Sequence, residues 1–148
     1  MRPKYLLVIW SVLVLAAQVW AADCGEWNTR EFFEAVTVAE VQDCLAAGAE
    51  VNARNWRGRT PLHLAAVSND NPAVTTALLA AGAEVNARDG EGWTPLHLAT
   101  WGAWGVDNPA VVVALLEAGA DANARNNEGR TPWDYAQENE DLRGTDAY

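Results

Sequence analysis

Short apolar segments separated by polar stretches run along most of the chain, and they predict pairs of short helices. Residues 62–65 (Leu-His-Leu-Ala) follow a Thr-Pro pair, in which Thr is a favoured N-cap and Pro suits the first helical position. The pair Asn71-Pro72 marks a second helix start, after which Val74 and Leu78 lie one turn apart on one face. The polar stretches are rich in Gly, Asn and Asp, so we expect extended arms closed by tight turns.

The same pattern returns at fixed spacings, which indicates an internal repeat. The motif Gly-x-Thr-Pro-Leu-His-Leu-Ala begins at Gly58 and Gly92, and an altered form begins at Gly129. Two more markers keep the same spacings, 34 and then 37 residues. These are Ala-Gly-Ala plus an acid at Gly48, Gly82 and Gly119, and Asn-Ala-Arg at Asn52, Asn86 and Asn123. We expect Gly82 and Gly119 to end the second helices in a left-handed conformation.

These motifs resemble the ankyrin-repeat consensus over residues 28–143, including Leu-Leu-x-x-Gly-Ala-x-x-Asn-Ala after the second helix start. The resemblance implies an all-α fold, an ankyrin-repeat solenoid of about four stacked helix-turn-helix units with projecting β-turn arms. It also divides the chain. The expected parts are an N-terminal segment at 22–27, a cap repeat at 28–53, ankyrin repeats at 54–87 and 88–124, and a C-terminal partial repeat and tail at 125–148.

Two departures from the repeat pattern are informative. The cap repeat lacks the Thr-Pro-Leu-His motif, and we expect Asn28 to cap its first helix, with Glu31 three positions later. The repeat at 88–124 carries a three-residue insertion between its two helices. Trp101 and Trp104 lie in this longer loop, which suggests an exposed aromatic surface.

The start of the chain differs from the rest and predicts a secretory signal peptide at residues 1–21. Arg2 and Lys4 precede an apolar run, and small residues at plausible cleavage positions end it. Cleavage after Ala21 fits best, and cleavage after Ala22 is the close second. The alternative is an uncleaved membrane anchor, because the apolar run nearly spans a bilayer.

Export would expose the two cysteines to oxidising conditions. Cys24 and Cys44 are therefore expected to form a disulfide, which would tie the segment before the first helix to the cap repeat. Two buried free thiols are the alternative. The compact basic signal and the close match of the repeats to consensus look bacterial, so we expect a periplasmic or secreted protein.

Composition narrows the function. Ten Lys and Arg stand against 20 Asp and Glu, a net charge of −10, which argues against nucleic acid as a partner. The only imidazoles, His63 and His97, occupy equivalent motif positions, and the resemblance implies that they hydrogen-bond neighbouring turns. Because no catalytic set, metal site or phosphate-binding Gly loop can be assembled, we expect no enzyme activity and no cofactor.

The remaining candidate is a recognition surface. The resemblance implies binding through turn tips and the inner side of the first helices, and Arg and Trp are frequent hot spots. The expected partner-binding residues are Arg54, Trp56, Arg57, Arg59, Arg88, Glu91, Trp93, Trp101, Arg125, Asn127, Glu128 and Arg130, with Trp104 added by its loop position. Arg54, Arg88 and Arg125 form a repeat-equivalent column that could instead only bridge repeats. We expect Trp93 to lie outside the core.

The sequence thus predicts a non-enzymatic, exported, monomeric module that binds a protein partner through its concave turn-and-helix face. After signal cleavage we expect no contact with a membrane. The alternative function is that of a dedicated accessory or inhibitor protein for one exported or periplasmic enzyme or toxin.

Overall fold

A computed structural model describes residues 24–101 and 109–138, and all regular structure within these ranges is helical. The elements are η1 (Cys24–Glu26), α2 (Arg30–Ala35), α3 (Val38–Ala46), α4 (Pro61–Ser68), α5 (Pro72–Ala80), α6 (Pro95–Trp101), α7 (Pro109–Glu117) and α8 (Pro132–Glu138). No helix in the described part of the chain combines the length and the apolar character needed to cross a bilayer. The predicted signal peptide lies outside the described residues.

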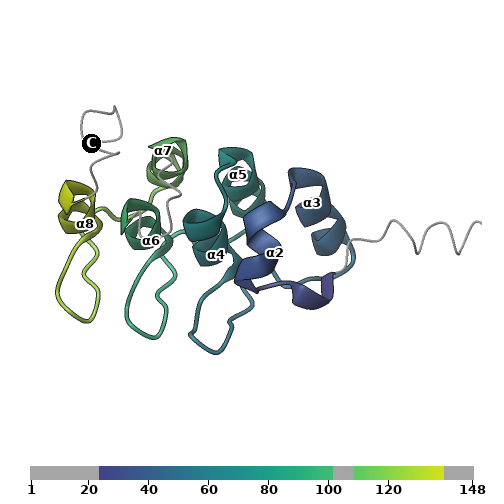
Figure 1. Ribbon diagram of the computed structural model, residues 1–148, viewed down its shortest axis with the longest axis horizontal. Coiled ribbons are helices and arrows are strands. Elements are labelled where there is room, and N and C mark those ends of the chain that lie inside the picture. Colours follow the sequence, from purple (N-terminus) through teal and green to yellow (C-terminus); the bar gives the residue numbers. More distant parts are fainter. Residues whose placement is uncertain (1–23, 102–108, 139–148) are drawn as a thin grey trace, which may run out of the picture.

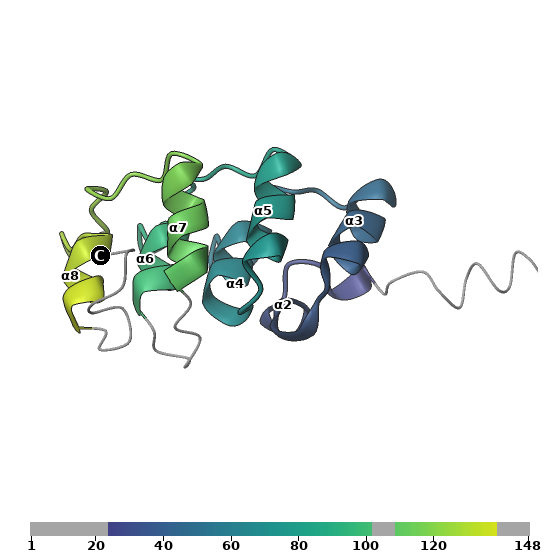
Figure 2. The same cartoon turned by 90° about the horizontal axis from the view of Figure 1, so that it is seen from above.

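The helices stack in two rows, which confirms the predicted solenoid. Helices α2, α4, α6 and α8 pack one against the next in an inner row, and α3, α5 and α7 form an outer row (Figures 1 and 2). Contacts between α4 and α5 and between α6 and α7 join the two rows. Each helix is too short to be stable alone, so the stacking of units supplies most of the stability.

The expected helix starts are largely confirmed. Pro61 and Pro95 begin α4 and α6, and the side chain of Asn71 accepts the Ala73 N–H at the start of α5. The cap of α2 was predicted incorrectly, because its N-cap is Thr29, whose hydroxyl accepts the Phe32 N–H. Asn28 has a φ of 75° and donates from its side-chain amide to the Ala53 carbonyl, so it cannot cap the helix.

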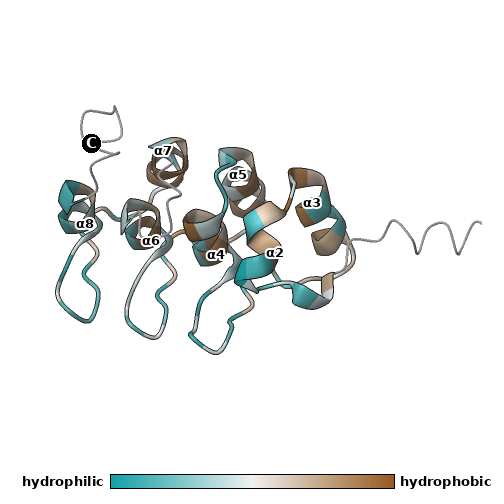
Figure 3. Cartoon of the chain, viewed as in Figure 1, coloured by the Kyte–Doolittle hydropathy of each residue, from teal (hydrophilic) through white to brown (hydrophobic). Residues whose placement is uncertain are grey.

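The core lies between the two rows. Cys44, Leu78 and Leu115 occupy equivalent positions in the outer row, and all three are fully buried. As expected, Gly82 and Gly119 follow α5 and α7 with φ of 93° and 92°, a conformation that favours glycine. Figure 3 shows the apolar residues gathered in the helices and hydrophilic residues along the loops below them.

Three arms, residues 52–60, 86–94 and 123–131, project from the inner row (Figure 1). The side chain of Asn55 accepts the N–H groups of Arg57 and Arg59, which closes the first turn, and Asp89 and Asn126 act likewise in the other two. Backbone hydrogen bonds join the arms, from the Gly90 N–H to the Arg57 carbonyl and from the Asn127 N–H to the Glu91 carbonyl. The arms are therefore fixed to one another.

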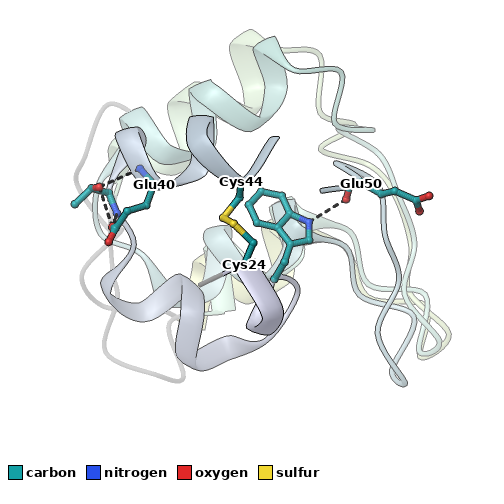
Figure 4. Close-up of a disulfide and its surroundings, with 6 residues drawn as sticks. Cys24, Glu40, Cys44 and Glu50 are labelled. Atoms are coloured by element: carbon teal, nitrogen blue, oxygen red, sulfur yellow. Dashed lines mark hydrogen bonds between the residues drawn. A yellow bond between two sulfur atoms is a disulfide. The ribbon is translucent and has the colours of Figure 1, made fainter. Parts of the chain in front are cut away.

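A disulfide between Cys24 and Cys44 fastens η1 to α3, as predicted (Figure 4). Beside it, the Trp27 indole N–H donates to the Glu50 carbonyl at 3.0 Å. Helix α3 is further fixed by a capping box between Thr37 and Glu40, and the backbone hydrogen bond from Thr37 lowers the pKa of the Glu40 carboxyl. These contacts anchor the N-terminal end of the solenoid.

Reduction of the disulfide should lower the free energy of unfolding by about 3 kcal/mol, because the bond closes a loop of 20 residues. Denaturant unfolding of the chain lacking residues 1–21, with and without reductant, measures this difference. The control is Cys24→Ser, whose unfolding should not respond to reductant, while Cys44 stays unchanged in the core. Equal unfolding free energies in both conditions would contradict the expected role of the bond.

Candidate partner-binding face

The predicted binding residues of the described part of the chain lie in the three arms, apart from Trp101 at the end of α6. We call the surface formed by the arms and the adjoining inner row of helices the arm face. The structure separates them by exposure. Trp93 is buried, and Arg59 and Arg130 are half-buried. The exposed residues are Arg54, Trp56, Arg57, Arg88, Glu91, Trp101, Arg125, Asn127 and Glu128. Trp104 lies outside the described residues.

The tip of the first arm differs in kind from the other two. Its residues Trp56 and Arg57 correspond to Gly90 and Glu91 in the second arm and to Asn127-Glu128 in the third. The Trp56 side chain is 86% exposed, and the guanidinium carbon of Arg57 lies 4.6 Å from the centre of its ring. Trp and Arg are both enriched among the residues that dominate binding energy at protein interfaces.

The expectation for Trp93 was wrong. Trp93 is equivalent to Arg59 and Arg130 at the base of an arm, not to Trp56 at a tip, and it is only 8% exposed. Its ring centroid lies 4.6 Å from that of Tyr135 and 5.2 Å from that of Trp101. Trp93 therefore belongs to a second apolar cluster of the core, which it shares with Val67, Leu98 and Tyr135.

Arg59 joins two arms through an ion pair. Its side chain is 13% exposed, and its Nε lies 3.1 Å from the Asp89 carboxylate, which is almost fully buried. This ion pair joins the first arm to the second. Arg59 therefore has a structural role, and its remaining exposed surface stays a candidate for binding.

The Arg column has a structural role in the first arm. Arg54 donates to the Arg88 carbonyl at 2.7 Å and lies 3.9 Å from the Glu84 carboxylate, so it bridges two repeats. Arg125 donates to the carbonyl of Gly129 within its own arm. Arg54 therefore links two repeats, and the exposed surfaces of Arg54, Arg88 and Arg125 stay candidates for binding.

The two imidazoles are structural. His63 Nδ1 accepts the Thr60 N–H at 3.1 Å, so the ring proton is on Nε2, which donates to the Trp93 carbonyl at 3.0 Å. Burial of the ring lowers its pKa to about 4. His97 makes the equivalent contacts one repeat later, and burial lowers its pKa as well. Both rings are neutral at physiological pH and use both nitrogens, which leaves neither available as a general base.

The arm face contains a pocket of about 370 Å³, which sequence reasoning missed. It lies where α2, the first arm and α4 meet, and is lined by Asn28, Thr29, Arg30, Glu31, Asn55, Trp56, Arg57, Arg59, Leu64 and Val67. The contribution of α2 could not be foreseen, because the cap repeat lacks the motif that fixes the register of the others. Among the described residues no group of His, Cys, Asp or Glu converges to hold a metal ion.

Two tryptophans of opposite burial provide a direct test of this assignment. Trp93→Ala should lower the free energy of unfolding by about 3–5 kcal/mol through a cavity in the second cluster. Trp56→Ala should change it by less than about 0.5 kcal/mol, as for an exposed site. Denaturant unfolding of both variants measures the difference. If Trp93→Ala were as mild as Trp56→Ala, the ring of Trp93 would not belong to the core.

The comparisons with known proteins agree with the geometry. None of the curated proteins compared with the chain matches it significantly. The family model for ankyrin repeats, in three copies, matches residues 34–126. This range covers most of the cap repeat, both repeats at 54–87 and 88–124, and the first two residues of the C-terminal partial repeat. Ankyrin repeats are generally protein–protein interaction modules and are typically non-enzymatic. This match agrees with the repeat period, the two rows of helices and the arms, and it shows that the chain belongs to the ankyrin-repeat family.

Proposed function

We propose that this protein is an exported, non-enzymatic module that binds one protein partner through the arm face. The observation that carries the proposal is the tip of the first arm, where Trp56 is 86% exposed. When a partner covers a large aromatic side chain, apolar surface leaves water, which favours binding. Trp is also among the residues most enriched in hot spots.

The rigidity of the arm face supports the proposal. Each tip is held by hydrogen bonds within its own turn and by backbone bonds to the neighbouring arm. A surface that is already ordered loses little conformational entropy on binding, which favours affinity. The arms therefore present their side chains in a fixed arrangement.

The distribution of charge distinguishes the arm face from the rest of the molecule. Apart from Arg30, every Arg of the described residues lies in an arm, whereas α3, α5 and α7 contain no Lys or Arg. The charged residues of these outer helices are Glu40, Asp43 and Glu117. This asymmetry would orient an approaching partner so that it meets the arms.

The exported location rests on two observations. The residues before Ala22 have the composition of a signal peptide, and the Cys24–Cys44 disulfide is of the kind that persists in oxidising compartments. The proposal places the mature chain in a periplasm or outside the cell.

Affinity capture from the source organism, quantified by mass spectrometry, tests the function. The bait is the mature chain, compared with a triple variant that changes one exposed residue in each arm, Trp56→Ala, Arg88→Glu and Arg125→Glu. One stoichiometric protein should be captured by the unchanged bait and lost with the triple variant. The matched control is Leu116→Ala in α7, a residue 37% exposed on the outer row, which should retain the partner. Retention by the triple variant, or loss with the control, would contradict binding through the arm face.

A further inference from the structure

We infer that the pocket between α2, the first arm and α4 receives an apolar side chain from an extended segment of the partner protein, and that Arg57 binds the side-chain carboxylate of an Asp or Glu close to it. The inference rests on the proposed function and names the chemistry of the partner at one end of the arm face.

The lining of the pocket includes aliphatic and aromatic side chains. Leu64 and Val67 of α4 line it with carbon, and the exposed Trp56 lines it from the arm. An apolar side chain in this space would contact carbon on several sides and would cover part of the indole. The volume of about 370 Å³ is enough for a Leu, Met or aromatic side chain.

The pocket exists because of one difference between repeats. At the base of the second arm, Trp93 is buried in a cluster with Val67 and Leu98. The first arm carries Arg59 at the equivalent position, and its side chain is drawn to Asp89 in the next arm. No indole from the base of the first arm therefore occupies the space beside Leu64.

The charged residues around the pocket indicate that Arg57 binds a carboxylate of the partner. Arg59 and Arg30 also line the pocket, but each already pairs with an acid, Asp89 and Glu34 respectively. The Arg57 guanidinium forms no ion pair with the described residues, and one of its faces rests on Trp56. Its N–H donors are directed around the plane of the guanidinium and can bind a carboxylate in a bidentate manner.

The opposite wall fixes where that carboxylate lies. Glu31 belongs to the first turn of α2, where an acid stabilises the helix, and it lines the pocket as well. It would repel a second acid on its own side, so the partner's Asp or Glu belongs on the side of the arm. The equivalents of Arg57 in the other arms are Glu91 and Glu128, which makes the first arm the one suited to an acidic residue.

A protein segment fits these features better than a nucleic acid does. Within the described part of the chain, Arg57 is the one cation lining the pocket that has no acidic partner, and the whole chain has a net charge of −10. Nucleic-acid binding instead relies on many cations that neutralise successive phosphates. An apolar side chain beside a carboxylate is a pattern that a short peptide segment provides.

Selection from a display library of short random peptides, with the mature chain as bait, tests the inference. The enriched peptides should share an apolar residue with an Asp or Glu close to it. Trp56→Ala and Arg57→Gln should each weaken the binding of a selected peptide by about tenfold or more. The matched control is Glu117→Gln, an exposed acid of the outer helix α7 that lies away from the arm face, which should leave the affinity unchanged.

A charge exchange makes the assignment of Arg57 specific. Arg57→Glu should abolish binding of the acidic peptide and should regain binding when the peptide's acid is replaced by Arg. Thermal melts establish that the variants fold, which we expect because both side chains are exposed at a tip. Selected peptides that lack an acid, no enriched peptide at all, or binding that ignores Trp56 and Arg57 would each overturn the inference.

The outcome can be separated from that of the proposed function. If the captured partner depends on Arg88 or Arg125 but not on Trp56 or Arg57, the function stands and the inference fails. If no partner depends on any arm, the function fails as well.

Discussion

His63 is fully buried between the first helix of its own repeat and the arm of the next, and both ring nitrogens are used there. One nitrogen accepts the backbone N–H of Thr60 and so fixes the start of α4. The other donates to the Trp93 carbonyl and so fixes the base of the second arm. His97 makes the same bridge from Thr94 to the Arg130 carbonyl. Both bridges require a neutral imidazole, because a protonated ring could not accept the N–H.

These bridges allow the arms to serve as a binding surface. The base of each following arm is held by an imidazole, and Arg59 with Asp89 adds an ion pair between the first two arms. The tips need contribute nothing to the core, so their side chains can differ without loss of the fold. Trp56, Gly90 and Asn127 occupy the same tip position in three arms. The differences between the three tips thus fall on residues that a partner can reach.

The sequence predicts the fold because the repeat is encoded locally. Thr-Pro and Asn-Pro mark helix starts, glycines mark helix ends, and the 34-residue spacing shows which residues are equivalent. The candidate site is less predictable, because exposure depends on contacts between repeats. Trp56 and Trp93 look alike in the sequence, but Trp93 lies over Tyr135, a residue more than a full repeat away. Arg59 and Asp89 show the same limit, since their pairing depends on how two arms lie side by side.

The N-cap of α2 was missed because Thr29 and Asn28 are adjacent residues of good capping type.

An NMR titration of the imidazoles in the mature chain tests the central claim, with His63→Gln and His97→Gln to assign the signals. If the rings are buried and neutral, the pKa of His63 is about 4 and that of His97 is below its ordinary value of 6.5. Because the unfolded chain then binds more protons, the free energy of unfolding should be at its full value above about pH 6.5 and should fall as the pH drops toward 4. A pKa near 6.5 for both rings in the folded protein, with no loss of stability over that interval, would contradict the account.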